Sequence, residues 1–391
     1  YWIDTAGVFP DRSGKPLTED TDLVVVGAGL TGLSTALHSA RKGARVTLVE
    51  KGQIGSGASA RNGGMANLGF TIGVGQAIRR YGLERAREIY NSYGEAVDTV
   101  ERLVNEESID CQFRRVGRLG VASRPAHFES KKAQQRDLAK YFGHETTLIG
   151  KAELRSEIGS DAYHGGLLDP FSAALHVGRF VRGMAEACER TGVEIHERNA
   201  AIGVRRTAAG RFEVSTERGV IRAGQVMMAT DAYTDKNFPW LRRQQVCLGS
   251  FIIVTEPLGE ELARDIIPKA RLIVDSNKVC HYFRLTPDNR LLFGGRARFA
   301  PSDPTSDKKS GAVLFREMCE IFPQLSGTKV EYVWGGSVGF AMDRIVHAGQ
   351  TEGGEALGLG RTGIFSHIVL PQAVRQALPG TNTMLVDLLK S

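Results

Sequence analysis

The chain has little of what marks metal-binding, disulfide-bonded or membrane proteins. Its 391 residues include five scattered cysteines, with no C-x-x-C pair and no histidine beside them at metal-ligand spacing. They predict buried or free thiols in a reducing compartment and no metal site. No uninterrupted apolar segment reaches the ~20 residues of a membrane span, and no signal-peptide pattern is present. We therefore expect a cytoplasmic protein. The cysteines are Cys111, Cys188, Cys247, Cys280 and Cys319.

Long basic runs and hydrolase motifs are also missing. The net charge is +6, but Lys131-Lys132 and Arg242-Arg243 are isolated pairs, so a nucleic-acid partner is not expected. The absence of a G-x-S-x-G elbow leaves a hydrolase triad without support. With 42% hydrophobic and 24% charged residues, the chain has an ordinary globular composition and room for one to three domains.

A glycine-rich turn stands between two β-branched runs near the start of the chain. Residues 23–26 (LVVV) lead into residues 27–32 (GAGLTG), an amphipathic stretch follows, and residues 46–49 (VTLV) end at Glu50. The order strand, glycine turn, helix, strand and acid is typical of sites that bind an ADP moiety. An ordinary βαβ unit with a glycine-rich turn is the alternative.

Each glycine of this turn, and the acid after it, has a physical reason to suit a dinucleotide. Gly27 permits the tight turn, Gly29 lets the backbone approach a pyrophosphate, and Gly32 lets the helix pack on the strand. The helix N-terminus offers free N–H groups to the anion. Glu50, 18 residues after Gly32, can accept hydrogen bonds from the ribose hydroxyls, which disfavours NADP.

A small polar loop after the acid favours FAD over NAD. Residues 55–64 read GSGASARNGG, and small residues with many exposed amides suit a loop pressed against a flat polar ring. The run from Gly27 to Gly64 resembles the D-amino-acid-oxidase-like family of FAD-dependent oxidoreductases. Its subgroup of γ-glutamylputrescine oxidoreductases and opine-type or other amine oxidases carries a similar loop. Further similar segments lie at 166–180, 226–234, 281–297 and 331–344, so that the resemblance covers about residues 1–348.

The resemblance implies FAD as cofactor and names its contacts. Besides the glycine turn and Glu50, the resemblance implies three further contacts with FAD. These are the loop on the flavin side, two strands near the adenine and pyrophosphate, and a turn near the isoalloxazine. Arg61 could instead be a surface charge, and Trp334 a core aromatic. The expected cofactor residues are Gly27, Ala28, Gly29, Thr31, Gly32, Glu50, Lys51, Ser56, Ala58, Asn62, Gly63, Gly64, Val204, Ala229, Thr230, Trp334, Gly335 and Gly336.

Tyr282 and Arg284 are the candidate substrate-binding and catalytic residues. They lie two apart on a predicted strand, hence on one face. Arg284 could hold a carboxylate bidentately, and Tyr282 could pack on or hydrogen-bond the substrate. The alternative is an outward-facing pair on an exposed sheet face. His281 points the other way, and His176 and Asp169 are expected to serve packing.

The expected fold is α/β, a Rossmann-like FAD-binding domain interleaved with a mixed-sheet (α+β) substrate domain. Helical spacing covers 76–107 and 173–191, and Pro287-Asp288-Asn289 marks a hairpin turn. The expected division is an arm at 1–21, an FAD domain at 22–76, 165–234 and 331–348, and a substrate domain at 77–164 and 235–330.

The C-terminal segment departs from this resemblance. Residues 349–391 are similar to the cytoplasmic coupling loop of amino-acid ABC transporter permeases, although the chain has no spanning helix. We expect a foreign tail that removes one wall of the flavin site, and the alternative is a divergent oxidase C-terminus. The matching positions are Glu355, Ala356, Gly358, Ile368, Leu370, Pro371, Gln372, Ala373, Arg375, Leu378 and Pro379.

The family resemblance implies oxidation of a C–N bond. The expected activity is hydride transfer from a small polar amine, amino acid or opine to flavin N5, giving an imine, with dioxygen or a quinone as acceptor. The second hypothesis is a catalytically impaired remnant of such an oxidase. A third is an interaction protein that docks on an ABC ATPase through its tail, a contact that we do not expect.

Overall fold

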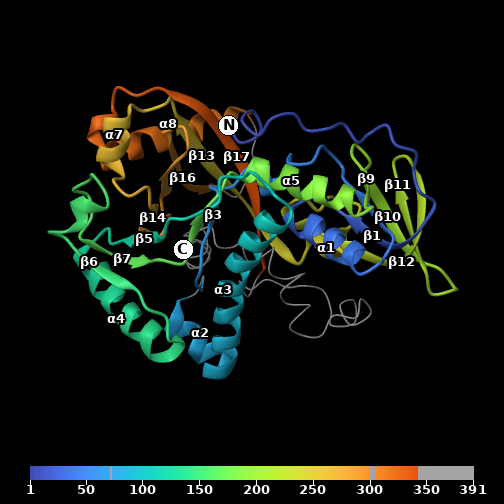
Figure 1. The fold of residues 1–391 in the computed structure, drawn as a ribbon, viewed down its shortest axis with the longest axis horizontal. Helices are drawn as coiled ribbons and strands as arrows, with labels where there is room; N and C mark the ends of the chain where they lie inside the picture. Colours follow the sequence, from blue (N-terminus) through green and yellow to red (C-terminus); the bar gives the residue numbers. More distant parts are fainter. Residues whose placement is uncertain (71–72, 299–303, 342–391) are drawn as a thin grey trace.

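Two large β-sheets organise the chain in the computed structural model, which describes residues 1–70, 73–298 and 304–341. Figure 1 shows one sheet beneath α1 and α5, and the other beneath α7 and α8. A three-stranded sheet, in the order β3-β8-β4, is the third. Its strands are β3 (Met65–Ala66), β8 (Ala173–Ala174) and β4 (Arg114–Arg115).

The first sheet has six strands in the order β10-β11-β12-β1-β2-β9. Its centre is parallel, since β1 pairs in parallel with β12 and β2, and β2 with β9. The β-branched runs predicted as strands form β1 and β2, which are buried on both faces as parallel strands require. The strands are β1 (Asp20–Val26), β2 (Val46–Val49), β9 (Glu194–His196), β10 (Ala201–Arg206), β11 (Phe212–Thr216) and β12 (Gly219–Met228).

Two helices cover one face of this sheet. Helix α1 (Leu30–Arg41) follows the glycine turn, and α5 (Val177–Arg190) packs beside it. Leu33, Leu37 and Val181 are fully buried in the core between the helices and the strands. The predicted helix at 173–191 therefore begins four residues later, because residues 173 and 174 form β8.

The second sheet has eight strands in the order β17-β13-β16-β15-β14-β5-β7-β6. Its β15–β16 hairpin turns at the predicted place, where Asn289 has a left-handed φ of 58° and its N–H bonds to Thr286 O. The strands are β5 (Arg118–Val121), β6 (Thr147–Gly150), β7 (Gly165–Asp169), β13 (Gln245–Thr255), β14 (Leu272–Val274), β15 (Tyr282–Leu285), β16 (Leu291–Arg298) and β17 (Val330–Ala341).

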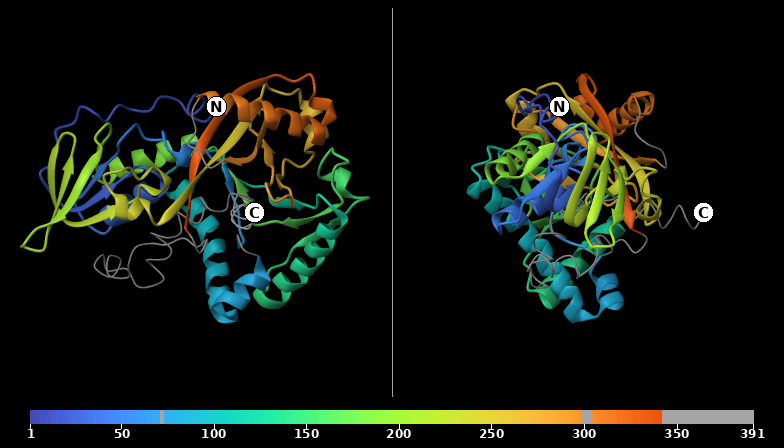
Figure 2. Two further views of the ribbon diagram at one scale, coloured as in Figure 1. Left: turned by 180° about the vertical axis from the view of Figure 1, so that it is seen from behind. Right: turned by 90° about the vertical axis from the view of Figure 1, so that its right-hand side faces the viewer.

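Helices cover both faces of the second sheet. On the outer face, α7 (Glu260–Ile266) and α8 (Pro304–Ile321) pack on a core that contains Phe283 and Phe293. On the other side stand α2 (Val74–Tyr81), α3 (Leu83–Glu106) and α4 (Pro125–Phe142), visible in both views of Figure 2. The single helix predicted at 76–107 is two helices, because Gly82 between them has a φ of +76°.

The remaining elements are short. They are the helix α6 (Pro239–Arg242) and the 3-10 turns η1 (Ala58–Ala60), η2 (Leu154–Ser156), η3 (Asp231–Tyr233) and η4 (Pro323–Leu325).

The N-terminal residues are packed rather than free. Trp2 and Arg12 are each only 1% exposed. The Trp2 indole donates to Asn62 O at 2.8 Å, and the Arg12 guanidinium pairs with Glu189 at 2.7 Å. The expectation of a plain polar arm was therefore incomplete, because its few apolar and cationic side chains fill the core.

Two strands of the expected FAD domain pair with strands of the expected substrate domain. Strands β7 and β17 were assigned to the FAD domain, but both pair within the eight-stranded sheet. The rest of the division stays a prediction. The tail at 349–391, with residues 342–348, lies outside the described residues.

Two further findings concern membrane-spanning helices and the cysteines. Within the described ranges, no helix is both long and apolar enough to cross a lipid bilayer. All five cysteines are free thiols, and Cys111, Cys188 and Cys280 are buried.

Candidate functional site

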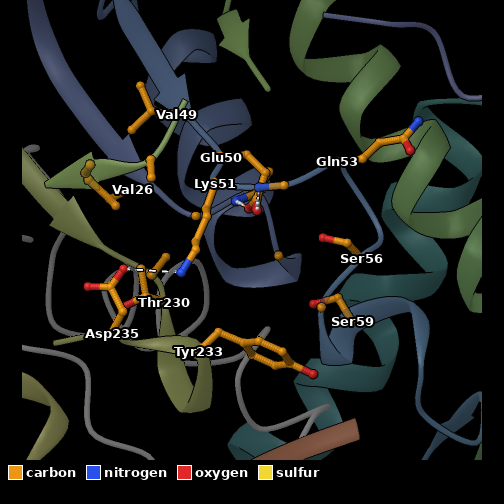
Figure 3. A pocket seen from close by; sticks show the side chains of 18 of the residues that line it. Val26, Val49, Glu50, Lys51, Gln53, Ser56, Ser59, Thr230, Tyr233 and Asp235 are labelled. Carbon is orange, nitrogen blue, oxygen red and sulfur yellow. Dashed lines mark hydrogen bonds and ion pairs between the residues drawn. The ribbon is translucent and has the colours of Figure 1, made fainter. Parts of the chain in front are cut away.

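A crevice of about 310 Å³ opens at the carboxyl ends of β1 and β2. Open α/β sheets bind ligands at this edge. The walls come from the glycine turn, the segment after β2, the start of β10 and the segment after β12 (Figure 3). Expected residues in the wall are Gly27, Ala28, Gly29, Glu50, Lys51, Ser56, Ala229 and Thr230.

The glycine turn leaves no room for a side chain at Gly27 or Gly32. Gly27 has a φ of +103°, and a Cβ there would lie 2.7 Å from Ala229 O. A Cβ on Gly32 would lie 1.8 Å from Gly27 O. The turn, the end of β12 and the first turn of α1 are therefore in backbone contact, which brings free N–H groups to the crevice.

Glu50 is fixed at the crevice wall by the backbone of both neighbouring segments. One carboxylate oxygen accepts from Ala28 N–H at 2.7 Å, and the other accepts from Gly52 N–H at 2.9 Å. A carboxylate can accept about four hydrogen bonds, so Glu50 retains capacity for ribose hydroxyls. Glu50 is also partly exposed in the crevice.

The first turn of α1 carries polar groups suited to an anion. The hydroxyl of Thr31 is buried and has no hydrogen-bond partner among the described residues. Leu30 N–H already donates to the Ser59 hydroxyl at 3.0 Å. Together with the close-packed turn at Gly27 and Gly32 and the acceptor at Glu50, these groups fit the diphosphate and ribose of a dinucleotide.

An ion pair joins two walls of the crevice. The Lys51 ammonium reaches across to Asp235 at 3.4 Å, beside Thr230 and the ring of Tyr233 (Figure 3). Sequence reasoning named Lys51 and Thr230 but missed Tyr233 and Asp235. The only signal for them is their position directly after the strand end at Ala229.

The polar loop is held in shape by Asn62. Its side-chain amide donates to Ala58 O and Ser59 O, and its side-chain oxygen accepts from Gly64 N–H at 2.9 Å. Asn62 is thus an internal brace of the loop. Asn62, Ala58, Gly63 and Gly64 do not line the crevice, whereas Ser56 does.

Strand β17 is fastened to the same loop. Trp334 donates its indole N–H to Arg61 O at 2.9 Å, and the Arg61 guanidinium donates to Gly335 O at 3.1 Å. A Cβ on Gly336 would lie 3.5 Å from the Arg61 Cβ. Arg61 is therefore not a plain surface charge. Trp334 and Gly335 contact this loop through Arg61, and their expected position near the isoalloxazine stays a prediction.

Val204 does not line the crevice. It lies within β10, is 38% exposed and pairs with Val214 of β11. Only the beginning of β10 reaches the crevice, where Ala200 and Ala201 form the wall. The strand then runs away from the site, which the sequence pattern could not show.

Tyr282 and Arg284 share one face of β15, but both are buried, so the exposed-face alternative is wrong. The Tyr282 ring fills the space above two glycines: a Cβ on Gly63 or Gly294 would lie 3.1 or 2.2 Å from it. Burial also raises the pKa of Tyr282.

The Arg284 guanidinium is surrounded by backbone. It donates to Gly64 O, to Leu175 O at 3.1 Å and to Leu285 O at 3.2 Å. Burial and nearby Arg114 lower its pKa to about 10. These carbonyls accept from Nε and Nη1 of Arg284, which thereby joins the loop to β15, and its expected contact with a substrate carboxylate stays a prediction.

The two histidines that we expected to be structural, His281 and His176, both have hydrogen-bond or ion-pair partners. His281 lies on the opposite face and pairs with Asp275 at 2.9 Å and Glu317 at 3.2 Å, and despite burial these acids raise its pKa to about 9. His176 caps α5 by accepting from Arg179 N–H, and burial lowers its pKa to about 4. Packing and capping account for both.

Comparison with known proteins gives the family. The profile of the DAO family, described as FAD dependent oxidoreductase, matches residues 22–369. A probable oxidoreductase OrdL of Haemophilus influenzae is 33% identical, covering 94% of this chain and 86% of the relative. The γ-glutamylputrescine oxidoreductase of Escherichia coli is 32% identical, covering 85% and 76%.

Solved structures agree on the fold. A glycine oxidase from Geobacillus kaustophilus superposes with a TM-score of 0.71 at 17% identity, covering 92% of this chain and 94% of its own. An L-amino acid deaminase from Proteus myxofaciens gives 0.72 at 14% identity, covering 94% and 93%.

The family match extends to residue 369, so the expected end of the oxidase at residue 348 is too early. Within the part of the chain that the structure describes, no group of three or more acidic, histidine or cysteine residues could hold a metal ion. The crevice fits the adenosine and diphosphate of FAD, and the match spans most of the chain. The chain belongs to the DAO family of FAD-dependent oxidoreductases.

Proposed function

We propose that the protein oxidises the C–N bond of a small polar amine, amino acid or opine to an imine. The observation that carries the proposal is the crevice of backbone amides and Glu50 within a chain of this family. The E. coli relative is named for γ-glutamylputrescine, and a Pseudomonas aeruginosa relative at 24% identity is a glycine oxidase.

FAD bound in this crevice would accept a hydride at its N5 atom from the carbon that bears the nitrogen. The reaction removes two electrons and two protons from the C–N unit, and water then hydrolyses the imine to a carbonyl compound and an amine or ammonia. The chain's residues bind and orient: Glu50 and the turn hold the nucleotide, and Arg61 and Trp334 hold the loop. The acceptor is dioxygen or a quinone.

Anaerobic titration tests the proposal. The protein, reconstituted with FAD, is mixed with γ-glutamylputrescine, putrescine, glycine and D- and L-alanine, and the flavin absorption band is recorded. Bleaching by one of these, with a carbonyl product by mass spectrometry, supports amine oxidation. A yellow protein that none of them bleaches contradicts this substrate class. A colourless protein that takes up no FAD supports the impaired remnant, the second hypothesis.

The acceptor is tested separately. After anaerobic reduction, air or a soluble quinone is added and the return of the oxidised flavin band is timed. Fast return in air supports oxidase activity, and return only with the quinone supports a dehydrogenase. A pull-down with an ABC ATPase subunit, with and without residues 349–391, tests the docking hypothesis, and we expect no capture in either case.

A further inference from the structure

A second cavity, of about 180 Å³, lies on the eight-stranded sheet. Its floor is Val274 of β14, Gly120 of β5 and Leu167 of β7. These three are directly opposite one another in register, and Val274 is opposite Tyr282. Side chains opposite one another share a face, so the cavity is on the face from which Tyr282 contacts Gly63 of the FAD loop.

The roof of the cavity comes from α3, α4 and the segment after β3. Tyr90, Leu138 and Phe70 supply apolar surface, while Lys131 and Gln134 of α4 supply polar groups. A cavity of this size suits one end of a small molecule, since whole-ligand pockets typically measure roughly 300–1,000 Å³. The cavity is separate from the crevice that fits FAD, because the two share no lining residue.

Lys131 brings an unpaired cation to this cavity. Its ammonium lies over the sheet, 2.9 Å from where a Cβ on Gly120 would be, and it makes no hydrogen bond or ion pair with any described residue. Burial and the neighbouring Arg118 lower its pKa to about 8, so most of the ammonium is still charged at pH 7. A desolvated ammonium without a partner is costly unless an anion joins it.

The acids in the wall are already occupied by other groups. Asp169 accepts from Phe171 N–H at 2.9 Å and lies 3.5 Å from His144 and 3.7 Å from Arg118. Asp275 accepts from Asn277 and from His281. The charge of Asp275 acts on Lys131 through space, but neither carboxylate lies within ion-pair distance of its ammonium.

A second unpartnered polar group lines the same cavity. The hydroxyl of Thr146 has no hydrogen-bond partner in the described structure, although the residue is only 8% exposed. Gln134 likewise makes no hydrogen bond to the described residues. An unpaired cation, a free hydroxyl and a free amide converging on one small space make a site for a carboxylate.

We propose that this cavity binds a carboxylate at the end of the substrate remote from the oxidised amine, with Lys131 as its counter-ion and Thr146 as a further donor. The inference rests on the proposed function and narrows it. The substrate class becomes an amine that carries a carboxylate several bonds away from the reacting carbon, rather than a simple diamine.

A non-oxidisable probe tests binding apart from chemistry. N-acetyl-N′-glutarylputrescine has the carboxylate but no free amine, and its terminal carboxamide is the uncharged match. Calorimetry with the FAD-loaded protein should show the carboxamide binding at least tenfold more weakly. Lys131→Met should weaken the carboxylate probe by a similar factor and remove the preference between the two probes.

Lys132→Met is the matched control, because the neighbouring Lys132 is 39% exposed and pairs with Glu129. It should leave both affinities unchanged, and Lys131→Arg should restore part of the preference if Lys131→Met disturbs folding. Equal affinity of the wild type for both probes, or an unchanged preference in a folded Lys131→Met protein, would overturn the proposal.

Turnover separates this proposal from the proposed function. Glutarylputrescine keeps the carboxylate and the amine, and acetylputrescine keeps the amine alone. The wild type should show a KM at least tenfold lower for glutarylputrescine with similar kcat, and Thr146→Val should raise that KM alone. Oxidation of both compounds with equal KM would support amine oxidation and contradict the carboxylate site. Binding of the carboxylate probe without oxidation of either amine would support the carboxylate site and contradict amine oxidation.

Discussion

The two cavities of this molecule are built in opposite ways. Most residues that line the FAD crevice come from one stretch of chain, residues 26–59, in which the glycine turn and Glu50 lie, and the rest come from the start of β10, the end of β12 and the residues after it. The cavity beneath Lys131 is made of side chains that three strands, three helices and the segments between them bring together from residues 68–275. A site built from local backbone leaves its pattern in the sequence, while a site built from distant side chains leaves none.

The largest effect is expected from a substitution in the glycine turn of the FAD crevice. Gly29→Val places a side chain where the pyrophosphate must approach, so FAD retention should be abolished. The measurement is the flavin absorbance of the purified protein. Gly14→Val is the control, because nothing lies within 4 Å of a Cβ there. Full flavin occupancy in Gly29→Val would move the site elsewhere.

The second largest effect is expected at Arg284, which joins the FAD loop to β15 of the second sheet. Arg284→Met removes the Arg284 donor of the Leu175 carbonyl and one of the two donors of the Gly64 carbonyl, which should lower the free energy of unfolding by about 2–4 kcal/mol. Thermal or denaturant unfolding measures it. Arg211→Met, on the exposed pair with Asp20, should cost under about 1 kcal/mol. A raised KM with unchanged stability would return Arg284 to the substrate site.

Glu50→Gln sharpens the contrast between the cavities. The carboxamide keeps one acceptor and turns an NH₂ toward a backbone N–H that Glu50 now satisfies, so FAD binding should weaken by roughly tenfold or more. Titration of the apoprotein with FAD gives the value. Binding of the carboxylate probe at Lys131 should not change, and Glu84→Gln on exposed α3 should change neither.

The smallest effect is a pH dependence confined to the second cavity. Affinity for the carboxylate probe should be retained below pH 8 and fall several-fold toward pH 9, as Lys131 loses its proton near its lowered pKa of about 8. The groups facing it are Arg118 of β5, Asp169 of β7, Asp275 after β14 and Tyr90 of α3. Calorimetry at pH 7 and 9 measures it, and a Lys131→Met protein should show no such fall. Equal wild-type affinity at both pH values would contradict the assignment.

The sequence predicted the features that depend on local chemistry. The β1–α1–β2 unit, the role of Gly27 and Gly32 and the turn at Asn289 all follow from φ requirements and close approach. The helix split at Gly82 was readable in principle, since glycine between two amphipathic stretches permits a positive φ.

Long-range contacts could not be read from the sequence. Burial of Trp2, the Arg61–Gly335 hydrogen bond and the position of Lys131 over Gly120 each join segments that no local pattern relates. The sequence could not show that Val204 lies outside the crevice wall either, because its position depends on the direction of β10. Alternation gave the shared face of Tyr282 and Arg284, but only the packed structure shows which carbonyls that face meets.

The fastening of Trp334 to Arg61 has a consequence for biosynthesis. The two residues are 273 positions apart, and domains generally begin to fold from the N-terminal side during translation. The nucleotide-holding half of the protein can therefore take shape early on the ribosome, but its loop is secured only when β17 has been made. Stable cofactor binding is therefore expected only late in the synthesis of each chain.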